Sequence, residues 1–389
     1  MKRQYVVLER PKKSTGGGFA AAPAEAGRAP RVSVDEFGPG RAAEVLRKRS
    51  VVAVAPVMPM KLIAPVAVSD GPEPLADQMA WGIRAVGADT TPFTGEGVVV
   101  AVLDTGIDAT HPAFAGVDLV RKNFTQGTDE DEHGHGTHCA GTIFGRDVNG
   151  TRIGVAPGIT KALIGKVLGE GGGSSDQIVQ AIQWAVAGGA SVISMSLGID
   201  FPGAVKEMVD QGVPTELATS MALEEYRANV MLFERLAGLV AAQASFGHTT
   251  LLVAAAGNES RRDLKPDFEI AVSPPAVADR VVSVAALASS AAGYQVAPFS
   301  NTGARLSGPG VNIMSAKRGG GLAAMSGTSM ATPHVAGIAA LWWQKLDAAG
   351  QLSLDALESS LIAGASTGGL KPGFDPHAVG TGMVRAPQS

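Results

Sequence analysis

Five short runs of apolar residues constrain most strongly how this chain folds. They cover residues 98–103, 162–168, 192–195, 251–255 and 281–285. A run without polar alternation is typical of a strand buried on both faces of a parallel sheet. Helical patterns lie between the runs, for example at residues 175–187. This alternation predicts an α/β fold with a mostly parallel sheet, in which functional residues gather at the carboxyl ends of the strands.

Charge and cysteine content exclude several classes of protein. The formal net charge is −4 and no long run of Lys and Arg occurs, which argues against nucleic acid as the main partner. Cys139 is the only cysteine, so the chain forms no intramolecular disulfide. The first apolar run is interrupted by Glu9 and Arg10, and no apolar stretch is long enough for a bilayer. We therefore expect a cytoplasmic protein without a membrane partner, and export without a cleaved signal stays open.

The region before the apolar runs divides into two parts. Residues 1–31 are expected to be a flexible tail, because residues 12–31 are rich in Lys, Gly, Ala and Pro without a period. Residues 32–70 are expected to form a small α+β unit and a linker. Its strands are predicted at 32–34 and 51–57, and its helix at 42–49. The remaining residues, 71–389, form the predicted main domain.

Four residues in this domain have the chemistry of a hydrolase. Asp104 ends the first apolar run, His135 opens a predicted helix, and Ser329 precedes another one. A serine hydroxyl needs a base to take its proton and a carboxylate to orient that base. Asn258 follows a buried strand directly, and its amide is suited to stabilise an oxyanion together with the backbone N–H of Ser329. Asp104, His135, Ser329 and Asn258 are therefore the predicted catalytic residues.

The motifs around these residues resemble the subtilase family. They read Asp-Thr-Gly-Ile-Asp, His-Gly-Thr-His, Ala-Ala-Gly-Asn and Gly-Thr-Ser-Met-Ala-Thr-Pro-His-Val-Ala-Gly, in the family's order, and the resemblance extends over residues 81–386. It implies a three-layer subtilisin-like fold with helices on both faces of the sheet, and a serine endopeptidase acting on proteins or peptides. It also implies that residues 32–70 are an inhibitory propeptide, self-cleaved between residues 61 and 79.

The resemblance also implies where a substrate binds. Family members hold an extended peptide between two edges of the cleft. The matching segments here are Gly171, Gly172 and Gly173 on one side and Ser196, Leu197 and Gly198 on the other. The pocket before the scissile bond would be lined by Ala256 and Gly257, with Ser273 at its base.

Three histidines beside an acidic run raise the possibility of a metal site. His133, His135 and His138 follow an acidic run at 129–132, but their spacing is not that of a zinc motif, so we expect no catalytic metal and interpret the acidic run as a solvated loop. The resemblance implies catalysis without a cofactor and a structural calcium in many relatives. Ala113 and Val148 occupy the positions of two calcium ligands, so the familiar site looks incomplete. A shifted register that uses Asp147 and Asn149 stays open.

Other features have structural interpretations. Cys139 is expected to be a small buried residue behind His135, and His334 to be structural. The segment at about 200–228 is longer than in short subtilases, and helical apolar faces follow it. This insertion is expected to be an extra packed layer, a flap near the cleft or a partner-binding surface.

Two rival functions remain at this point. One is a catalytically silent binding protein, which the intact set of four residues argues against. The other is a hydrolase of esters or non-protein amides, which the extended Gly-rich edges argue against.

Overall fold

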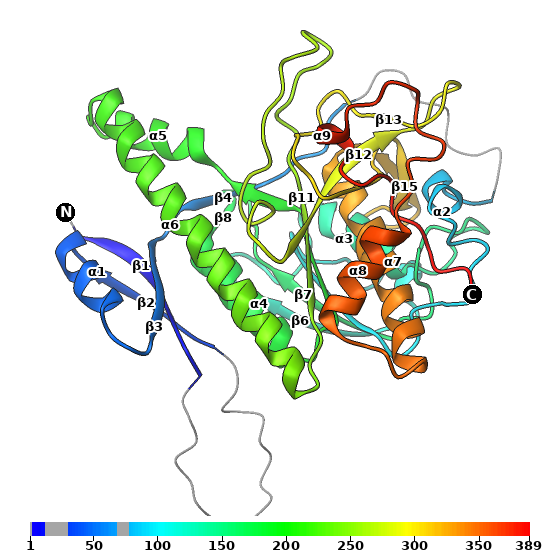
Figure 1. Ribbon diagram of the computed structural model, residues 1–389, viewed down its shortest axis with the longest axis horizontal. Helices are drawn as coiled ribbons and strands as arrows, with labels where there is room; N and C mark the ends of the chain where they lie inside the picture. The colour runs from blue at the N-terminus through cyan, green and yellow to red at the C-terminus, as the bar shows by residue number, and fades with distance from the viewer. Residues whose placement is uncertain (1, 12–29, 68–77) are drawn as a thin grey trace, which may run out of the picture.

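The fold is built around an eight-stranded, mostly parallel sheet (Figure 1). The computed structural model describes residues 2–11, 30–67 and 78–389. The strand order is β13-β12-β11-β9-β5-β7-β6, with β14 beside β12 and only β13 antiparallel to its neighbour. The strands are β5 (Val99–Asp104), β6 (Asp118–Asn123), β7 (Lys161–Lys166), β9 (Val192–Met195), β11 (Leu251–Ala255), β12 (Val281–Ala288), β13 (Gln295–Val296) and β14 (Leu306–Pro309).

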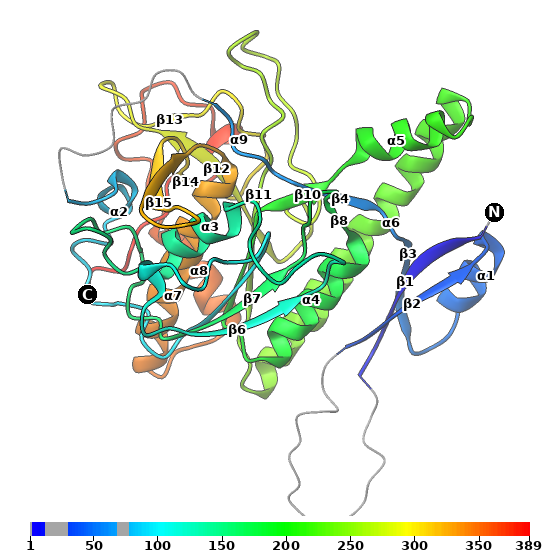
Figure 2. The ribbon, with the colours of Figure 1, turned by 180° about the vertical axis from the view of Figure 1, so that it is seen from behind.

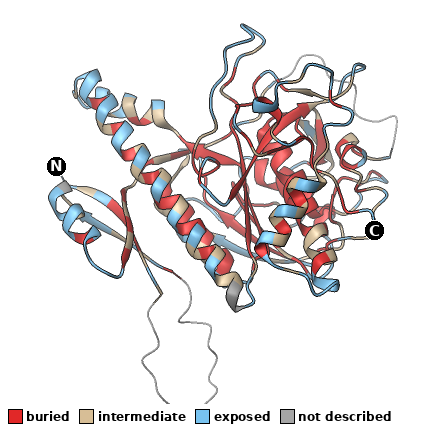
Figure 3. Ribbon diagram, in the orientation of Figure 1, coloured by how far each residue is buried: buried red, intermediate tan, exposed pale blue. Residues whose placement is uncertain are grey.

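Helices cover both faces of this sheet, as Figure 3 shows by the red interior. On one face, Val100 and Val102 of β5 pack in a common core with α3 (His135–Phe144) and α7 (Thr328–Ala348). On the other face, Ala101 and Leu103 pack with α4 (Ser175–Ala187) and α6 (Thr215–Ala242). Alternate residues of one strand therefore serve opposite layers, and the predicted three-layer α/β fold is confirmed.

Smaller elements complete the main domain. A hairpin of β15 (Ile313–Ala316) and β16 (Leu322–Met325) packs against α3. The remaining elements are α2 (Trp81–Ala85), the 3₁₀ turns η1 (Pro112–Phe114) and η2 (Gln243–Phe246), α8 (Leu354–Gly364) and α9 (Pro376–Val379). None of the helices in the described part of the chain is both long and apolar enough to span a membrane.

The N-terminal region forms a separate three-stranded antiparallel sheet in the order β2-β1-β3. Its elements are β1 (Arg3–Glu9), β2 (Arg31–Phe37), α1 (Pro39–Leu46) and β3 (Val51–Pro56), together called the N-terminal unit below. The prediction of a tail from residue 1 is wrong for β1, which is the central strand. Its four-residue buried segment at 5–8 is too short to stand out in sequence and becomes a strand only by pairing with β2 and β3. Residues 12–29 and the predicted linker at 69–72 lie outside the described residues.

The N-terminal unit packs on the main domain through one face of its sheet. Val6 and Leu8 of β1 and Ala53 and Ala55 of β3 share a core with residues of α4 and α6. The opposite face is covered by α1, through Val7, Val45 and Val51. Figure 1 shows this unit in blue beside the long helix α6.

After β3 the chain continues into the main domain as β4 (Pro59–Leu62), called the cleft strand below. It pairs antiparallel with β8 (Gly173–Ser174) on one side and with β10 (Leu197–Ile199) on the other. Figure 2 shows β4, β8 and β10 together at one side of the main sheet. A segment from the N-terminal region thus completes a small sheet whose two outer strands belong to the main domain.

The predicted insertion folds as two helices. α5 (Phe201–Asp210) and the first part of α6 project beyond the main domain next to the N-terminal unit (Figures 1 and 2). Ala204, Ala218 and Ala222 are buried between these helices, and the rings of Phe201 and Tyr226 meet edge to face. We call residues 201–230 the helical arm.

Two helical glycines provide a test of the packing around α7. A Cβ added to Gly337 would lie 2.6 Å from the Cβ of Val155, whereas one added to Gly238 on α6 would meet no atom within 4 Å. We expect Gly337→Ala to destabilise the protein by about 1–3 kcal/mol through overpacking. Gly238→Ala is expected to stabilise it by about 0.5–1 kcal/mol, because alanine favours the helix. Denaturant midpoints measure both changes, and a shift of the same sign in the two variants would contradict this packing.

Candidate active site

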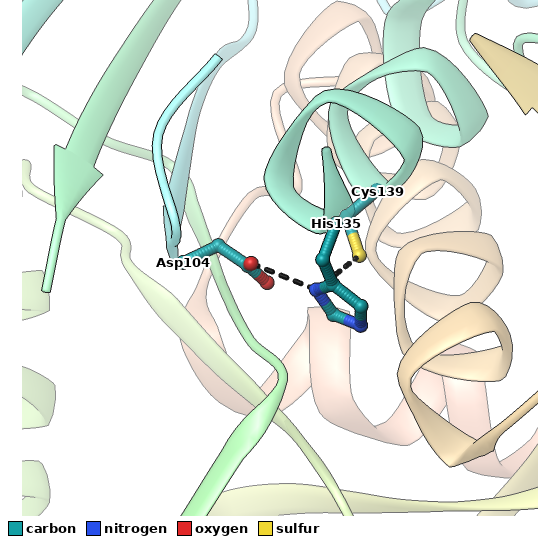
Figure 4. Close-up of side chains that lie close together, drawn as sticks. All are labelled: Asp104, His135 and Cys139. Carbon is teal, nitrogen blue, oxygen red and sulfur yellow. Dashed lines mark hydrogen bonds and ion pairs between the residues drawn. The ribbon is translucent and has the colours of Figure 1, made fainter. Parts of the chain in front are cut away.

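Asp104 and His135 form a buried pair at the end of β5 and the start of α3 (Figure 4). The Nδ1 atom of His135 lies 2.7 Å from Oδ1 of Asp104, and the side chains are at most 1% exposed. The backbone N–H of Thr105 donates to the same carboxylate oxygen at 2.8 Å. Burial lowers the pKa of His135, but the charge of Asp104, the neighbouring Cys139 and the hydrogen bonds to both together raise it well above 6.5. The carboxylate is thus placed to hold the proton on Nδ1 and leave Nε2 for chemistry.

Asp131 fixes the entry to α3, a role the sequence reasoning missed. The prediction of a solvated loop is wrong for this residue, which is 2% exposed. One carboxylate oxygen accepts from Gly134 N and Thr105 Oγ1, each at 2.8 Å, and the other from N and Oγ1 of Thr137 at 2.9 and 2.6 Å. Burial raises the pKa of Asp131, but these hydrogen bonds outweigh it and lower the pKa. The signal available in the sequence was a carboxylate just before a helix start, where free N–H groups need an acceptor.

Ser329 lies in the first turn of α7, next to the pair. Ser329 is fully buried. The Sγ atom of Cys139 lies 3.4 Å from the carbonyl oxygen of Ser329 and 3.7 Å from Nδ1 of His135, so Cys139 lies between the two residues. The thiol is buried and its pKa is raised by burial, in keeping with a small packing residue. Ser329 Oγ donates to the carbonyl oxygen of Ile63, just after the cleft strand, at 2.7 Å. His135 Nε2 is buried and has no hydrogen-bond partner among the described residues.

Asn258 lies beside the start of α7 with its amide aimed into the same cleft. Its Oδ1 accepts from the backbone N–H and the hydroxyl of Thr328, both at 2.9 Å, which fixes the side-chain orientation. Its Nδ2 donates to the carbonyl oxygen of Ala64 at 2.9 Å. A Cβ on Gly327 would lie 2.9 Å from this Nδ2, so glycine is needed for the close approach. The structure therefore brings all four predicted catalytic residues to one place.

The predicted substrate edges are the two strands that hold the cleft strand. Met60 pairs with Gly173, Lys61 with Gly198 and Leu62 with Leu197. Ile63 N–H donates to the carbonyl oxygen of Ser196 at 3.3 Å. Gly172 lies against the same strand, because a Cβ there would meet Met60 O at 2.6 Å. Gly171 and Gly172 line a cavity of about 530 Å³ beside the cleft strand.

The side chain of Ile63 points to the predicted pocket. A Cβ on Gly198 would lie 3.8 Å from Ile63 Cδ1 and 3.0 Å from Ser273 Oγ. The side chains of Ile63 and Ser273 therefore both lie against Gly198, at the wall of this pocket. Ala256 and Gly257 follow β11 as predicted, and Ala256 is fully buried. Gly257 has a φ of +116° and its N–H donates to Thr328 Oγ1 at 3.2 Å, so its main structural role is to support the turn before Asn258.

The rings of His138 and His334 are held by structural contacts. His138 Nε2 bonds to Ile313 O at 2.9 Å, and burial lowers its pKa to about 3. His334 Nδ1 bonds to Met330 O at 2.8 Å, and burial lowers its pKa to about 4. Both rings therefore stay neutral at pH 7. The ring of His133 meets that of His135 edge to face at 6.1 Å, without a shared metal position.

Potential metal ligands converge at the same buried pair. Within the described ranges, the only three candidate ligands that converge are Asp104, His135 and Cys139, which already contact one another. Ala113 and Val148 are buried apolar side chains and offer no oxygen to a hard cation. The residues at these positions therefore do not fit the calcium site that the resemblance implies.

Comparisons with known proteins relate this chain to one family. The model of the subtilase family matches residues 95–382. An intracellular serine protease of Paenibacillus polymyxa is 34% identical over 298 residues, 75% of this chain and 79% of that protein. Subtilisin Savinase of Lederbergia lenta is 36% identical over 279 residues, 69% of this chain and 86% of that protein. M-protease of Shouchella clausii strain KSM-K16 is 35% identical over 280 residues, 70% of this chain and 61% of that protein.

Replacing Asp131 tests its support of the site. We expect Asp131→Ala to lower the free energy of unfolding by about 1–3 kcal/mol at pH 7, because it leaves buried N–H and hydroxyl groups unpaired. Since the pKa of Asp131 is lowered on folding from 3.8, its stabilisation is present above pH 3.8. It is lost as the pH falls through the lower folded-state pKa, so the variant and the parent converge in strong acid.

The matched control is Asp129→Ala, an exposed carboxylate of the same loop. Denaturant unfolding at pH 7 should show less than about 0.5 kcal/mol for this change. Equal losses for the two variants would mean that Asp131 does not support the helix start.

Proposed function

Because the chain belongs to the subtilase family of serine-type endopeptidases, we propose that it hydrolyses peptide bonds through an acyl-enzyme on Ser329. His135 acts as general base and acid, Asp104 orients it and Asn258 stabilises the oxyanion. The observation that carries this proposal is the cleft strand. This extended segment lies between the two edge strands β8 and β10. The carbonyl oxygens of the two residues after it, Ile63 and Ala64, accept hydrogen bonds from Ser329 Oγ and Asn258 Nδ2.

The chemistry follows from the roles of these groups. Ser329 Oγ attacks the substrate carbonyl carbon as His135 Nε2 takes the hydroxyl proton. Asp104 keeps the other proton on Nδ1 and stabilises the imidazolium, consistent with the high pKa of His135. The imidazolium then gives its proton to the leaving amine, and the C–N bond breaks. Water, activated by the same imidazole, cleaves the ester and restores Ser329.

Two donors would hold the negative oxygen of the tetrahedral intermediates. One is Nδ2 of Asn258, whose orientation is fixed by Thr328. The other is the backbone N–H of Ser329, in the first turn of α7, where N–H groups have no partner within the helix. Such preorganised donors stabilise the charge of the transition state more than the neutral carbonyl of the substrate.

We also propose that the N-terminal unit and the cleft strand keep the enzyme inactive. Ser329 Oγ donates to the carbonyl of Ile63, whereas Asn258 Nδ2 donates to the carbonyl of Ala64. Attack requires the same carbonyl to meet both the nucleophile and the oxyanion donor. The bound segment therefore has the geometry of an inhibitor, and its cleavage requires either a rearrangement or a second enzyme molecule.

Asn258 provides a sharp test of catalysis. We expect Asn258→Asp to lower kcat by about 10²–10³, the loss typical of the equivalent donor in a subtilisin, because the carboxylate keeps the shape but loses the N–H donors. The test uses chains whose residues 70–76 are replaced by a recognition sequence for an unrelated protease, so maturation does not depend on the variant. After the cut N-terminal piece has been removed by dilution and gel filtration, a peptide-amide assay compares parent, Asn258→Asp and Ser329→Ala. A parent freed of this piece that is no faster than Ser329→Ala would refute peptidase activity.

Self-processing is tested by mass spectrometry at neutral pH. We expect the unmodified chain to lose about 60–80 residues, the range set by the linker prediction. Ser329→Ala alone should stay intact and should be cut when mixed with a small amount of the active chain. Cleavage of isolated Ser329→Ala at the same rate would show that another protease processes it, and an intact unmodified chain would argue against self-maturation.

A further inference from the structure

The side chain of Lys61, in the cleft strand, ends between two carboxylates of the main domain. Its Nζ atom lies 3.4 Å from Oδ1 of Asp200 and 3.3 Å from Oε1 of Glu259. Asp200 directly follows the edge strand β10, at the point where the chain enters α5 (Figure 2), and Glu259 directly follows Asn258. Among the described residues, both carboxylates form their ion pairs with Lys61. The cleft therefore carries a two-carboxylate site for a cationic side chain, which sequence reasoning did not single out.

Each of the two carboxylates is held by contacts within the main domain. Asp200 caps α5, and its Oδ1 accepts from the backbone N–H of Gly203 at 3.3 Å. A Cβ on Gly203 would clash with this carboxylate, so glycine permits the approach. Oε2 of Glu259 accepts from Nδ2 of Asn301 at 2.8 Å, and Asn301 is only 1% exposed. Because both groups are oriented in this way, they lose less side-chain freedom when a cation binds.

The register of the cleft strand decides which residue of a bound chain reaches this site. Lys61 pairs with Gly198 of β10, and alternate side chains of a strand point to the same face. Lys61 and Ile63 therefore lie on one face of the small sheet. Ile63 contacts the predicted pocket, and its carbonyl oxygen accepts from Ser329 Oγ. A chain cut after the residue that replaces Ile63 presents its third residue before the scissile bond to the two carboxylates.

The charges at this site can distinguish side chains, which the backbone pairing of the cleft strand does not. The side chains of Lys61, Asp200 and Glu259 are 36%, 33% and 39% exposed, so water screens each ion pair. A single pair of this kind typically changes an equilibrium by about 1.4- to 5-fold. Here one cation meets two carboxylates, whereas an anionic side chain in its place would be repelled by both. The contrast between a basic and an acidic residue is therefore larger than the effect of one pair.

We propose that Asp200 and Glu259 form a subsite that selects a Lys or Arg side chain at the third residue before the scissile bond. Lys61 occupies this subsite in the structure. Selection during hydrolysis rests on the peptidase function proposed above, whereas binding of the cationic side chain does not. The preferred substrates are extended segments with a basic residue at this position, and segments with an acidic residue there are disfavoured.

The experiment compares three peptide amides that differ only at this position. Each carries the sequence of residues 59–63, with Lys, Gln or Glu in the place of Lys61 and a chromogenic amine after the isoleucine. The enzyme is cut at the foreign recognition sequence and freed of its N-terminal piece, as in the test of Asn258. We expect kcat/KM to be about tenfold higher for the lysine peptide than for the glutamate peptide.

Two features of this preference identify its electrostatic origin. The difference should lie mainly in KM, because the ion pairs form with the bound substrate as well as in the transition state. The ratio of the lysine to the glutamate peptide should also fall towards one in about 1 M salt, which screens exposed charges. A ratio that salt leaves unchanged would contradict an ion-pair subsite.

Variants without the charges assign the preference to these two residues. Asp200→Asn and Glu259→Gln keep the shapes and the hydrogen-bond acceptors, and each should lower the ratio by about threefold. Together they should bring it to about one. The ratio compares two peptides on one enzyme, so a loss of folded protein cancels. The control Glu207→Gln removes an exposed charge of α5 and should keep the parent ratio. Equal ratios in the parent and the double variant would overturn the proposal.

Peptide binding separates this proposal from the proposed peptidase function. The cut Ser329→Ala chain, freed of its N-terminal piece, is titrated with fluorescent forms of the three peptides, and anisotropy gives their dissociation constants. Tighter binding of the lysine peptide, without hydrolysis by the parent, would mean that the subsite stands and the enzymatic function fails. Hydrolysis by the parent with equal kcat/KM and equal binding for all three peptides would mean the reverse. Absence of binding for every peptide would overturn the subsite.

Discussion

The parallel sheet must be covered on both faces, and the rest of the structure depends on this constraint. Strands β5, β9 and β11 are buried along their length, so helices pack on each side of them. The chain returns over the sheet after each strand, which brings the strand ends and the starts of α3 and α7 to one edge. Asp104, His135 and Ser329 meet there because of the topology, although they are far apart in the sequence.

Different hydrogen bonds at this edge serve peptide binding and the proposed reaction. The cleft strand uses backbone pairing that any extended peptide can reproduce, so the edges hold a chain with little regard to its side chains. The proposed reaction requires one carbonyl to meet both Ser329 and Asn258, and the bound segment presents two different ones. A small shift of the backbone therefore distinguishes a substrate from an inhibitor in the same groove.

The helical arm makes further polar contacts with the N-terminal unit, outside the cleft. The sheet and the two edge strands belong to the fold of the family, whereas residues 201–230 supply polar contacts with the N-terminal unit. Apolar packing of the N-terminal sheet on α4 and α6 is non-directional and tolerates many sequences. The pair of Arg3 with Glu225 depends on both side chains and so adds selectivity to that packing, whereas Asn229 bonds to a backbone carbonyl that any residue at position 56 offers.

Local patterns predicted the layers and the four candidate catalytic residues, because buried strands and helix starts leave signals within a few residues of sequence. They did not reveal the strand at Arg3–Glu9, whose stability comes from pairing with partners up to about fifty residues away. Nor did they reveal Asp131, which looks like any acidic loop residue until its carboxylate meets the N–H groups of α3. Only the tertiary structure decided which carbonyls face Ser329 and Asn258 and what the arm contacts, because these depend on long-range packing rather than on local sequence.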